Sequence, residues 1–379
     1  MATAHHVEVV LCAVAGILAA SAAARAGTPW RFISVGDSRG PDNGINAAIL
    51  AEIAGRIVAE QPDAVVFFGD LVEGSDDTGE LISQLTTWRD TMQVVYDASI
   101  AVYAVRGNHE DQGSVDAWNA VFAGPYAMPG NGPPDEINVT YSLVHKNAFI
   151  AGLDEYSGHT HRVNQGWLDG QLAANTQPHV FAFGHEPAFK AAHEDCLDSY
   201  PSDRDAFWAS IAQAGGRVYF CGHDHFYDHA RIDDQDGNPD NDLHQCIIGT
   251  AGAPLVVFDG VYDGSNSNMI PRQQYDASVY GYMVMDIDGL NVALTWMQRV
   301  GADDYVAMET WSYTAFPGPG DLNADGYVDA ADLDPFGGCM AGPGNPPAGG
   351  CGTADLDGSG DVDLADFAAL QALPVGGGA

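Results

Sequence analysis

Two aspartates, one asparagine and three histidines lie in short motifs whose residue types can bind metal ions. In chain order the motifs are GDSRG with Asp37, GDLVEG with Asp70, RGNHE with Asn108, GHEP with His185, and GHDH with His223 and His225. Carboxylate oxygen and imidazole nitrogen together suit Zn, Mn or Fe, whereas a closed structural zinc site commonly includes cysteine. The motifs therefore predict an open transition-metal site.

Most of these motifs follow a run of Val, Ile, Phe or Tyr, which predicts a buried strand. Such strands are expected at residues 31–35, 64–68, 101–105, 179–183 and 218–221. Loops at the carboxyl ends of parallel strands meet in one crevice, where open α/β folds bind ligands. The motifs are therefore expected to converge, although long segments separate them.

The remaining elements complete an α/β fold. Helical periodicity predicts helices at residues 45–60, 79–96, 114–122, 165–175 and 204–214. Asn147 separates two apolar runs and predicts a hairpin that opens a second sheet, with later strands at residues 243–248, 281–286 and 292–297. The expected architecture is a sandwich of two sheets flanked by helices, with its loops gathered at one edge.

In this order, the motifs resemble those of the calcineurin-like metallophosphoesterases, which include purple acid phosphatases, phosphoprotein phosphatases and many secreted phosphodiesterases. The resemblance covers roughly residues 29–315. It implies two divalent metals, Zn, Mn or Fe, that clamp a phosphate while a metal-bound hydroxide attacks phosphorus. The implied ligands are Asp37, Asp70 and His225 for the first metal, and Asp70, Asn108, His185 and His223 for the second, with Asp70 as the bridge.

The same resemblance implies roles for residues beside the ligands. His109 would be a general acid or a hydrogen-bonding support of the ligands, and Glu110 would orient it. Arg106 would grip phosphate or form an ordinary salt bridge. Arg39 stands where many members have a histidine ligand, so the first metal site is expected to be weak and Arg39 to contact the substrate. Glu73 replaces the tyrosine of purple acid phosphatases, so tyrosinate-to-iron colour is not expected.

Three function hypotheses follow. The leading one is a secreted phosphatase acting on phosphomonoesters of small molecules or proteins. A phosphodiesterase would share every motif. The third is a binding or scaffold protein in which Arg39 has disabled the site.

Three further histidines, His159, His161 and His193, lie in predicted loops near the crevice and could contact the substrate. A lone histidine in a loop is more often only solvated.

Charge and the amino terminus restrict the partners and the location. The chain has 52 acidic and 14 basic residues and a net charge of −38, which opposes nucleic acid as a partner. An apolar run at residues 7–24 leads to the triplet Ala24-Arg25-Ala26 and predicts a signal peptide of residues 1–26. The mature protein, starting at residue 27, is then expected to be extracellular or periplasmic, with no membrane span. An uncleaved anchor is the alternative.

The catalytic domain, residues 27–315, is followed by a Gly/Pro-rich linker at 316–320, an internal repeat at 321–373 and a tail at 374–379. DLNADGYVDAAD and DLDGSGDVDLAD align, with the oxygen-bearing positions and the central glycine of an EF-hand calcium loop. The repeat resembles dockerin type I domains, which implies two Ca²⁺ ions and short helices at 333–336 and 367–373. The implied ligands are Asp321, Asn323, Asp325, Tyr327 (carbonyl), Asp329, Asp332, Asp355, Asp357, Ser359, Asp361 (carbonyl), Asp363 and Asp366.

The repeat implies a cohesin-like or cell-surface partner, but it departs from well-known dockerins. Ala330-Ala331 and Leu364-Ala365 stand where partner-contacting hydroxyl groups would lie, which argues against ordinary cohesin binding. An insertion between Cys339 and Cys351 lengthens the spacer, and these cysteines predict a local disulfide. Cys221 is expected to be a buried thiol, whereas pairing of Cys196 with Cys246 is left open.

Overall fold

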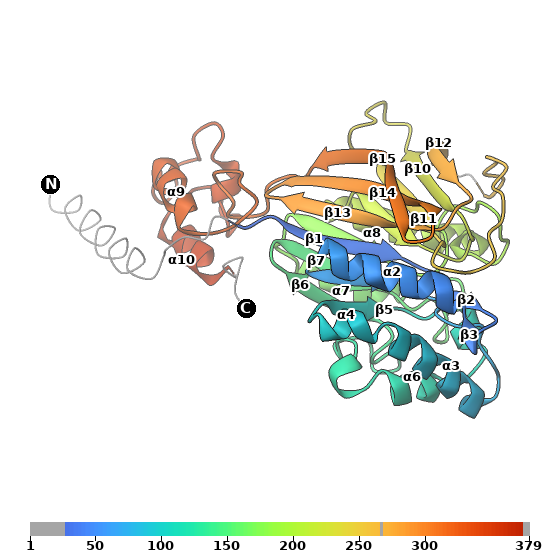
Figure 1. Cartoon of the computed structure of the whole chain (residues 1–379). Helices are drawn as coiled ribbons and strands as arrows, with labels where there is room; N and C mark the ends of the chain where they lie inside the picture. The colour runs from blue at the N-terminus through green and yellow to red at the C-terminus, as the bar shows by residue number, and fades with distance from the viewer. Residues whose placement is uncertain (1–26, 266–267, 374–379) are drawn as a thin grey trace, which may run out of the picture.

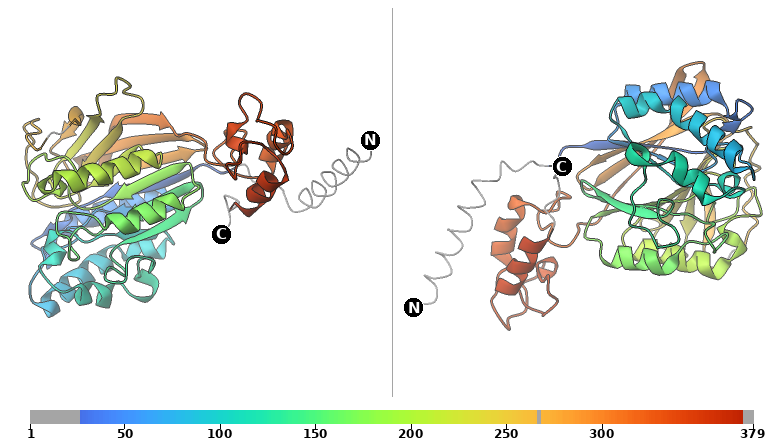
Figure 2. Two further views of the ribbon diagram at one scale, coloured as in Figure 1. Left: turned by 180° about the vertical axis from the view of Figure 1, so that it is seen from behind. Right: turned by 90° about the horizontal axis from the view of Figure 1, so that it is seen from below.

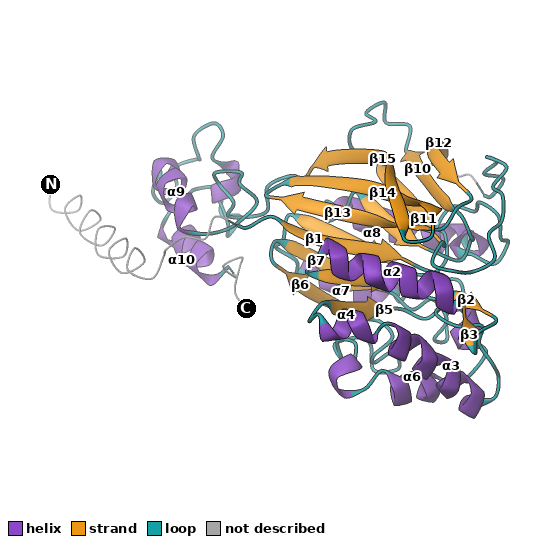
Figure 3. Ribbon diagram, in the orientation of Figure 1, coloured by secondary structure: helices purple, strands orange, loops and turns teal. Residues whose placement is uncertain are grey.

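Two β-sheets pack face to face and carry helices on their outer faces (Figures 1 and 3). The computed structural model describes residues 27–265 and 268–373. The predicted signal peptide and the tail therefore lie outside the described residues. In the right-hand view of Figure 2, one set of helices lies above the sheets and another below them.

Parallel strands form the centre of each sheet. Strands β1, β4 and β5 are parallel in the first sheet, and β7, β8, β9 and β11 are parallel in the second. The first sheet has the order β15 (Asp304–Thr314), β14 (Asn291–Gly301), β13 (Gly281–Asp288), β1 (Trp30–Val35), β4 (Ala64–Phe67), β5 (Ala101–Ala104). The second has the order β12 (Ile270–Ala277), β10 (Tyr227–Asp233), β11 (Leu243–Ile248), β9 (Val218–Cys221), β8 (His179–Phe183), β7 (Ala148–Gly152), β6 (Tyr141–His145).

The helices bury apolar stripes against the sheets. In α2 the buried residues include Leu50, Ile53, Ala54 and Ile57, at the three- and four-residue spacing of one helix face. The longer helices of the sandwich are α2 (Ala47–Glu60), α3 (Thr78–Thr91), α7 (Gln165–Ala173) and α8 (Pro201–Gln213), and the shorter ones are α4 (Gln93–Asp97), α5 (Asn108–Asp111), α6 (Val115–Val121) and the 3-10 turns η1 (Gly124–Tyr126) and η2 (Leu197–Ser199). Among the described residues, no helix has the length and apolar character needed to cross a membrane.

The structure confirms the predicted α/β sandwich and the five strands that precede the metal motifs. It also confirms the hairpin at Asn147, between β6 and β7. The helix predicted at 79–96 is two helices that meet at Met92. Strands β10, β12 and β15 were not predicted, nor was the two-residue ribbon of β2 (Arg39–Gly40) and β3 (Gly44–Ile45).

The C-terminal repeat forms a small unit at the end of the sandwich where β1 begins, whereas the metal motifs follow the ends of the strands (Figure 1). The first acidic loop leads into η3 (Ala330–Asp332) and α9 (Leu333–Cys339), whereas η4 (Gly352–Ala354) precedes the second loop, which leads into α10 (Leu364–Ala372). The predicted disulfide between Cys339 and Cys351 is formed. Cys196, Cys221 and Cys246 are buried free thiols, so Cys196 and Cys246 do not pair.

Candidate metal centre

The five motif loops meet at the carboxyl-terminal edge of the parallel strands, as predicted. Backbone hydrogen bonds tie the loops together, for example from Asp37 N to the Gly69 carbonyl at 3.1 Å and from Gly222 N to the His185 carbonyl at 2.9 Å. Asp37, Asp70 and His223 have positive φ values of 62°, 47° and 69°. Non-glycine residues rarely adopt this conformation, and such residues cluster at functional sites.

Glycines in the motifs allow this close approach. A Cβ added to Gly107 would lie 2.2 Å from Oδ1 of Asp70, and one added to Gly222 would lie 2.0 Å from Oδ2 of Asp37. Both distances are far below van der Waals contact. The glycines of Gly-Asn-His and Gly-His-Asp-His are therefore needed for space at the carboxylates.

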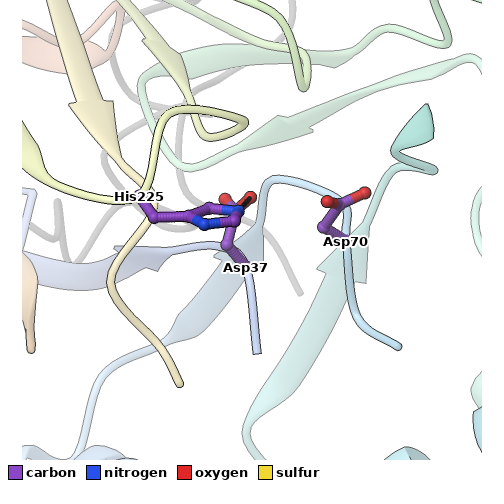
Figure 4. Close-up of side chains that lie close together, drawn as sticks. All are labelled: Asp37, Asp70 and His225. Atoms are coloured by element: carbon purple, nitrogen blue, oxygen red, sulfur yellow. Dashed lines mark ion pairs between the residues drawn. The ribbon is translucent and has the colours of Figure 1, made fainter. Parts of the chain in front are cut away.

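Asp37, Asp70 and His225 form a first group of metal-binding side chains. One ligand atom from each lies within 4.8 Å of the others, and all three residues are buried. Figure 4 shows the three side chains reaching a common space from separate loops. Nε2 of His225 is 3.6 Å from Oδ1 of Asp37. The predicted ligands of the first metal are thus brought together.

A second group shares Asp70 with the first. Nε2 of His185 lies 3.4 Å from Oδ1 of Asp70 and 3.0 Å from Oδ1 of Asn108, and Nδ1 of His223 lies 3.2 Å from the same His185 nitrogen. Asp70 therefore stands between the two groups, which is the position of a bridging carboxylate.

Outer contacts determine which histidine nitrogen is free to bind a metal. Nδ1 of His185 lies 2.6 Å from the Phe68 carbonyl, and Nδ1 of His225 lies 3.0 Å from the Pro254 carbonyl. A carbonyl oxygen only accepts hydrogen bonds, so each Nδ1 carries the proton and each Nε2 presents a lone pair to the ligand group. Metal-binding histidines in proteins commonly have such partners. The donor set thus fits transition metals.

His223 has the opposite arrangement, because its outer partner is a carboxylate. Nε2 of His223 lies 3.5 Å from Oδ1 of Asp195, which leaves Nδ1 facing His185. Sequence analysis did not identify Asp195. Nothing in the sequence AAHEDC distinguishes it from the adjacent Glu194, which instead binds Lys190 at 2.6 Å.

Burial and nearby charges shift the pKa values of the predicted ligand residues. Burial, and then the nearby Asp70 carboxylate, raise the pKa of Asp37 well above its usual value. Burial lowers the pKa of His185 to about 3 and, together with the Arg39 charge, that of His225 to about 4, so both rings are neutral. A divalent cation would relieve the repulsion between the carboxylates and bind neutral imidazole.

Arg39 lies at the edge of the first group. Its Nε is 3.5 Å from Oδ2 of Asp70, and its Nη1 is 3.1 Å from Oε2 of Glu73. Asp70 and Glu73 therefore screen the guanidinium charge. Nε of Arg39 is buried without a hydrogen-bond partner, which leaves one donor available beside the ligands.

The structure corrects the role predicted for Glu110. Its carboxylate accepts hydrogen bonds from the backbone nitrogens of Gly107, Asp70 and Val72 at 2.7, 3.0 and 3.0 Å, so it braces the Asp70 loop and does not orient His109. The backbone carbonyl of Glu73 lies 2.5 Å from Nδ1 of His109 instead.

The sequence left two roles open for Arg106, phosphate binding and a salt bridge. In the structure Arg106 forms a salt bridge. Its Nε and Nη2 each donate to Asp154 at 2.9 Å, Nη1 donates to Asp111 at 3.3 Å, and Nη2 also donates to Ser157. The side chain is buried. Because every guanidinium nitrogen has a partner on a loop, Arg106 holds two loops together.

The three loop histidines have specific partners. His159 contacts Glu136 at 3.0 Å and His161 contacts Glu186 at 2.8 Å. His193 contacts Asp224, and its ring lies 4.6 Å from that of His223. His193 therefore lies beside the ligand group, and none of the three is only solvated.

The loops at the carboxyl ends of the parallel strands gather two carboxylates, an amide and three histidines. This combination of fold and site is that of a metallophosphoesterase. The family model for calcineurin-like phosphoesterases matches residues 31–227, more than half of the chain, and the chain belongs to this family. Members typically bind a dinuclear metal centre, and the protein is a metal-dependent phosphoester hydrolase. No curated protein matches the sequence.

Solved structures share the fold at low sequence identity. Purple acid phosphatase PPD1 from yellow lupin (Lupinus luteus) has a TM-score of 0.59 and 15% identity over 76% of this chain, which spans 54% of that protein. GAP50, described as the anchor in the inner membrane complex of Plasmodium, has a TM-score of 0.53 and 14% identity over 82% of this chain and 94% of its own. PhoD has a TM-score of 0.53 and 12% identity over 76% of this chain and 70% of its own.

Proposed function

We propose that the chain is an exported phosphatase that hydrolyses phosphomonoesters at a two-metal site. The observation that carries the proposal is the position of Asp70, within 3.4 Å of His185 in one ligand group and part of the group of Asp37 and His225 in the other. When bound, the metals supply Lewis acidity at the phosphate oxygens and lower the pKa of a water molecule.

The ligands divide around Asp70. Asp37 and His225 would hold the first metal with it, and Asn108, His185 and His223 would hold the second. Asn108 contributes a neutral oxygen, so the site keeps a net positive charge when loaded, which favours a phosphate dianion. Its amide nitrogen remains a hydrogen-bond donor for a substrate oxygen.

Two side chains at the site are the candidates for proton transfer and phosphate binding. The Glu73 carbonyl fixes the His109 proton on Nδ1, so Nε2, 3.8 Å from Oδ2 of Asp70, is the atom that would hold a second proton and give it to the leaving oxygen. Arg39 would contact the non-bridging oxygens with its guanidinium group, which lies beside Asp70.

The alternatives use the same scaffold. A phosphodiesterase would need the same ligands and differ in the pocket around them. A binding or scaffold protein is also possible on this fold, since GAP50 is described as an anchor. This alternative has less support here, because all six predicted ligand positions carry polar side chains and none carries an apolar one.

An assay on the purified chain tests the proposal. Monoester and diester substrates would be compared with added Mn²⁺ or Zn²⁺, in the parent and in Asp70→Asn. We expect monoester hydrolysis by the parent and the joint loss of bound metal and activity in the variant. Full activity in Asp70→Asn would overturn the two-metal assignment, and faster diester hydrolysis by the parent would favour the phosphodiesterase.

Two proposals concern the ends of the chain. Residues 1–26 would direct export, and the repeat would bind two Ca²⁺ ions. Support for calcium comes from the aligned loop patterns and, in the second loop, from carboxylate oxygens within 4.8 Å of one another in the groups Asp355, Asp357, Asp366 and Asp361, Asp363, Asp366. A cell-surface or cohesin-like partner would then be held through the repeat.

A further inference from the structure

The two acidic loops of the repeat have matching sequences but unequal surroundings. In the first loop Asp321 and Tyr327 are only 3% and 5% exposed. The matching residues of the second loop, Asp355 and Asp361, are partly exposed. Gly326 is buried, whereas its counterpart Gly360 is exposed. Something outside the repeat therefore covers the first loop.

One buried amide connects the first loop to the sandwich. Nδ2 of Asn147 donates to the carbonyl of Gly289, in the turn between β13 and β14, at 2.9 Å, and to the carbonyl of Gly326 at 3.2 Å. Oδ1 of Asn147 accepts from Nε1 of Trp30 at 3.0 Å. Both amide hydrogens and the oxygen are therefore used, and one hydrogen is committed to the repeat.

Two glycines bring the backbones of the repeat and the sandwich into contact. A Cβ on Gly326 would lie 2.6 Å from the carbonyl carbon of Gly289, and a Cβ on Gly289 would lie 2.6 Å from the carbonyl oxygen of Asp325. Gly360, at φ 87°, has the same conformation as Gly326, at φ 90°, but a Cβ there would meet open space. Only the first loop shows this close approach.

Tyr327 completes the contact. A Cβ added to Gly27, just before β1, would lie 1.7 Å from the Tyr327 ring, so the ring covers the backbone there. Tyr327 also lines a small cavity together with Thr176, Pro178 and Leu373. The linker takes part, because a Cβ on Gly318 would lie 2.7 Å from the Thr176 carbonyl.

We infer that the catalytic domain is itself the partner of the first half of the repeat. Asn147, the Gly289 turn and residues 176–178 form the receiving surface, and Tyr327 is the anchor. The repeat is then a fixed extension of the sandwich, not a freely tethered module with two equivalent halves. The sandwich does not cover its second loop, where Leu364 is 59% exposed.

Small-angle X-ray scattering of the full chain tests this inference, with calcium in excess. The parent should scatter as one compact particle that the docked arrangement fits. Gly326→Ala should increase the radius of gyration and the maximum dimension, because the added methyl group strikes Gly289. Gly360→Ala is the matched control: it strains the same loop position equally and should leave the scattering unchanged.

Two results would overturn the inference. One is parent scattering that fits only a mixture of extended arrangements, which does not depend on any variant folding. The other is an equal response to Gly326→Ala and Gly360→Ala. Phosphoester hydrolysis, measured on the same samples, should be unchanged in both variants, because the contact lies at the end of the sandwich away from the metal motifs.

Discussion

Asp195 and His223 are joined by a contact of 3.5 Å between a carboxylate oxygen and Nε2, while Nδ1 of the same ring points to His185 at 3.2 Å. The two nitrogens of His223 are thus divided between an outer carboxylate and the ligand group. Burial alone would lower the pKa of His223, but the contact with the Asp195 carboxylate and the charges of further carboxylates raise it to about 9.

The first prediction concerns this carboxylate. Asp195→Asn should weaken metal binding at the second site by roughly 10- to 100-fold, because the ring loses the charge that fixes Nδ1 as the ligand atom. Calorimetric metal titration measures the change. Glu194→Gln is the control, since Glu194 binds Lys190 and should not affect the metal. Unchanged affinity in Asp195→Asn would remove the positioning role.

The second prediction separates proton donation from metal binding. His109→Ala should keep both metals and lower turnover by roughly 10²- to 10⁴-fold, most for substrates with poor leaving groups, because these need a proton in the transition state. A series of aryl and alkyl phosphates measures the dependence. Equal losses across the series would leave His109 with a structural role only.

The third prediction concerns the residue that replaces a histidine ligand. Arg39→His should tighten the first metal site, because imidazole can coordinate and a guanidinium cannot, and should weaken substrate binding, seen as a higher KM. Glu73→Gln serves as the control: it breaks the ion pair with Arg39 but adds no ligand, so the first site should not tighten. Two equally tight sites in the parent, unaffected by Arg39→His, would contradict the prediction.

The fourth prediction concerns acid stability. Burial lowers the pKa of His179 to about 4, below its value in the unfolded chain. The folded state thus resists protonation, and stability falls as the pH drops below about 6.5 towards 4. Between about pH 7.5 and pH 4.5 the parent should lose roughly 2–3 kcal/mol through this group. His179→Gln, which can still donate to the Gly289 carbonyl, should lose less, measured by denaturant unfolding at both pH values.

His159 provides a control of opposite sign. Burial would lower its pKa, but the hydrogen bond to Glu136 raises it. Protonation therefore stabilises the folded state, and this contribution is lost as the pH rises through the folded pKa. His159→Gln should accordingly be more harmful at low pH than at high pH. The same pH response in both variants would contradict these assignments.

The fifth prediction concerns calcium. The repeat has only a small core, of Phe336, Ala354, Val362 and Leu370, and its crowded carboxylates repel one another. Chelator should therefore remove the helical circular-dichroism signal of α9 and α10 while the catalytic domain stays folded. A spectrum indifferent to chelator would argue against calcium loops.

Sequence reasoning succeeded where local pattern and long-range structure agree. Most of the motif loops follow short apolar runs whose length and content of Val, Ile, Phe and Tyr favour buried strands, so both the strands and the crevice were predictable. Strand β10, YDHARID, was missed because its polar residues are buried by distant partners, such as Tyr262 for Asp228 and Glu309 for His229. Strand β15 was missed because much of it is exposed at the sheet edge.

The roles of single charged residues were less predictable. Arg106 binds Asp154, which is 48 residues away, and no pattern near either residue indicates the pair. Glu110 turns to backbone groups of the Asp70 loop, which fold against it only in three dimensions. The order of motifs thus predicted which side chains meet, whereas the contacts that support them depend on how the loops pack together.

The left-handed backbone of Asp37, Asp70 and His223 implies a conflict between folding and binding. Glycine would adopt those φ values with less strain, so in the metal-free protein each of the three ligands costs stability that a glycine would not. Replacing any of them with glycine would ease the loop and remove a ligand. Glycine at these positions would thus give the more stable fold, whereas aspartate and histidine are the residues that a catalyst needs. Bound metal would compensate for the stability lost.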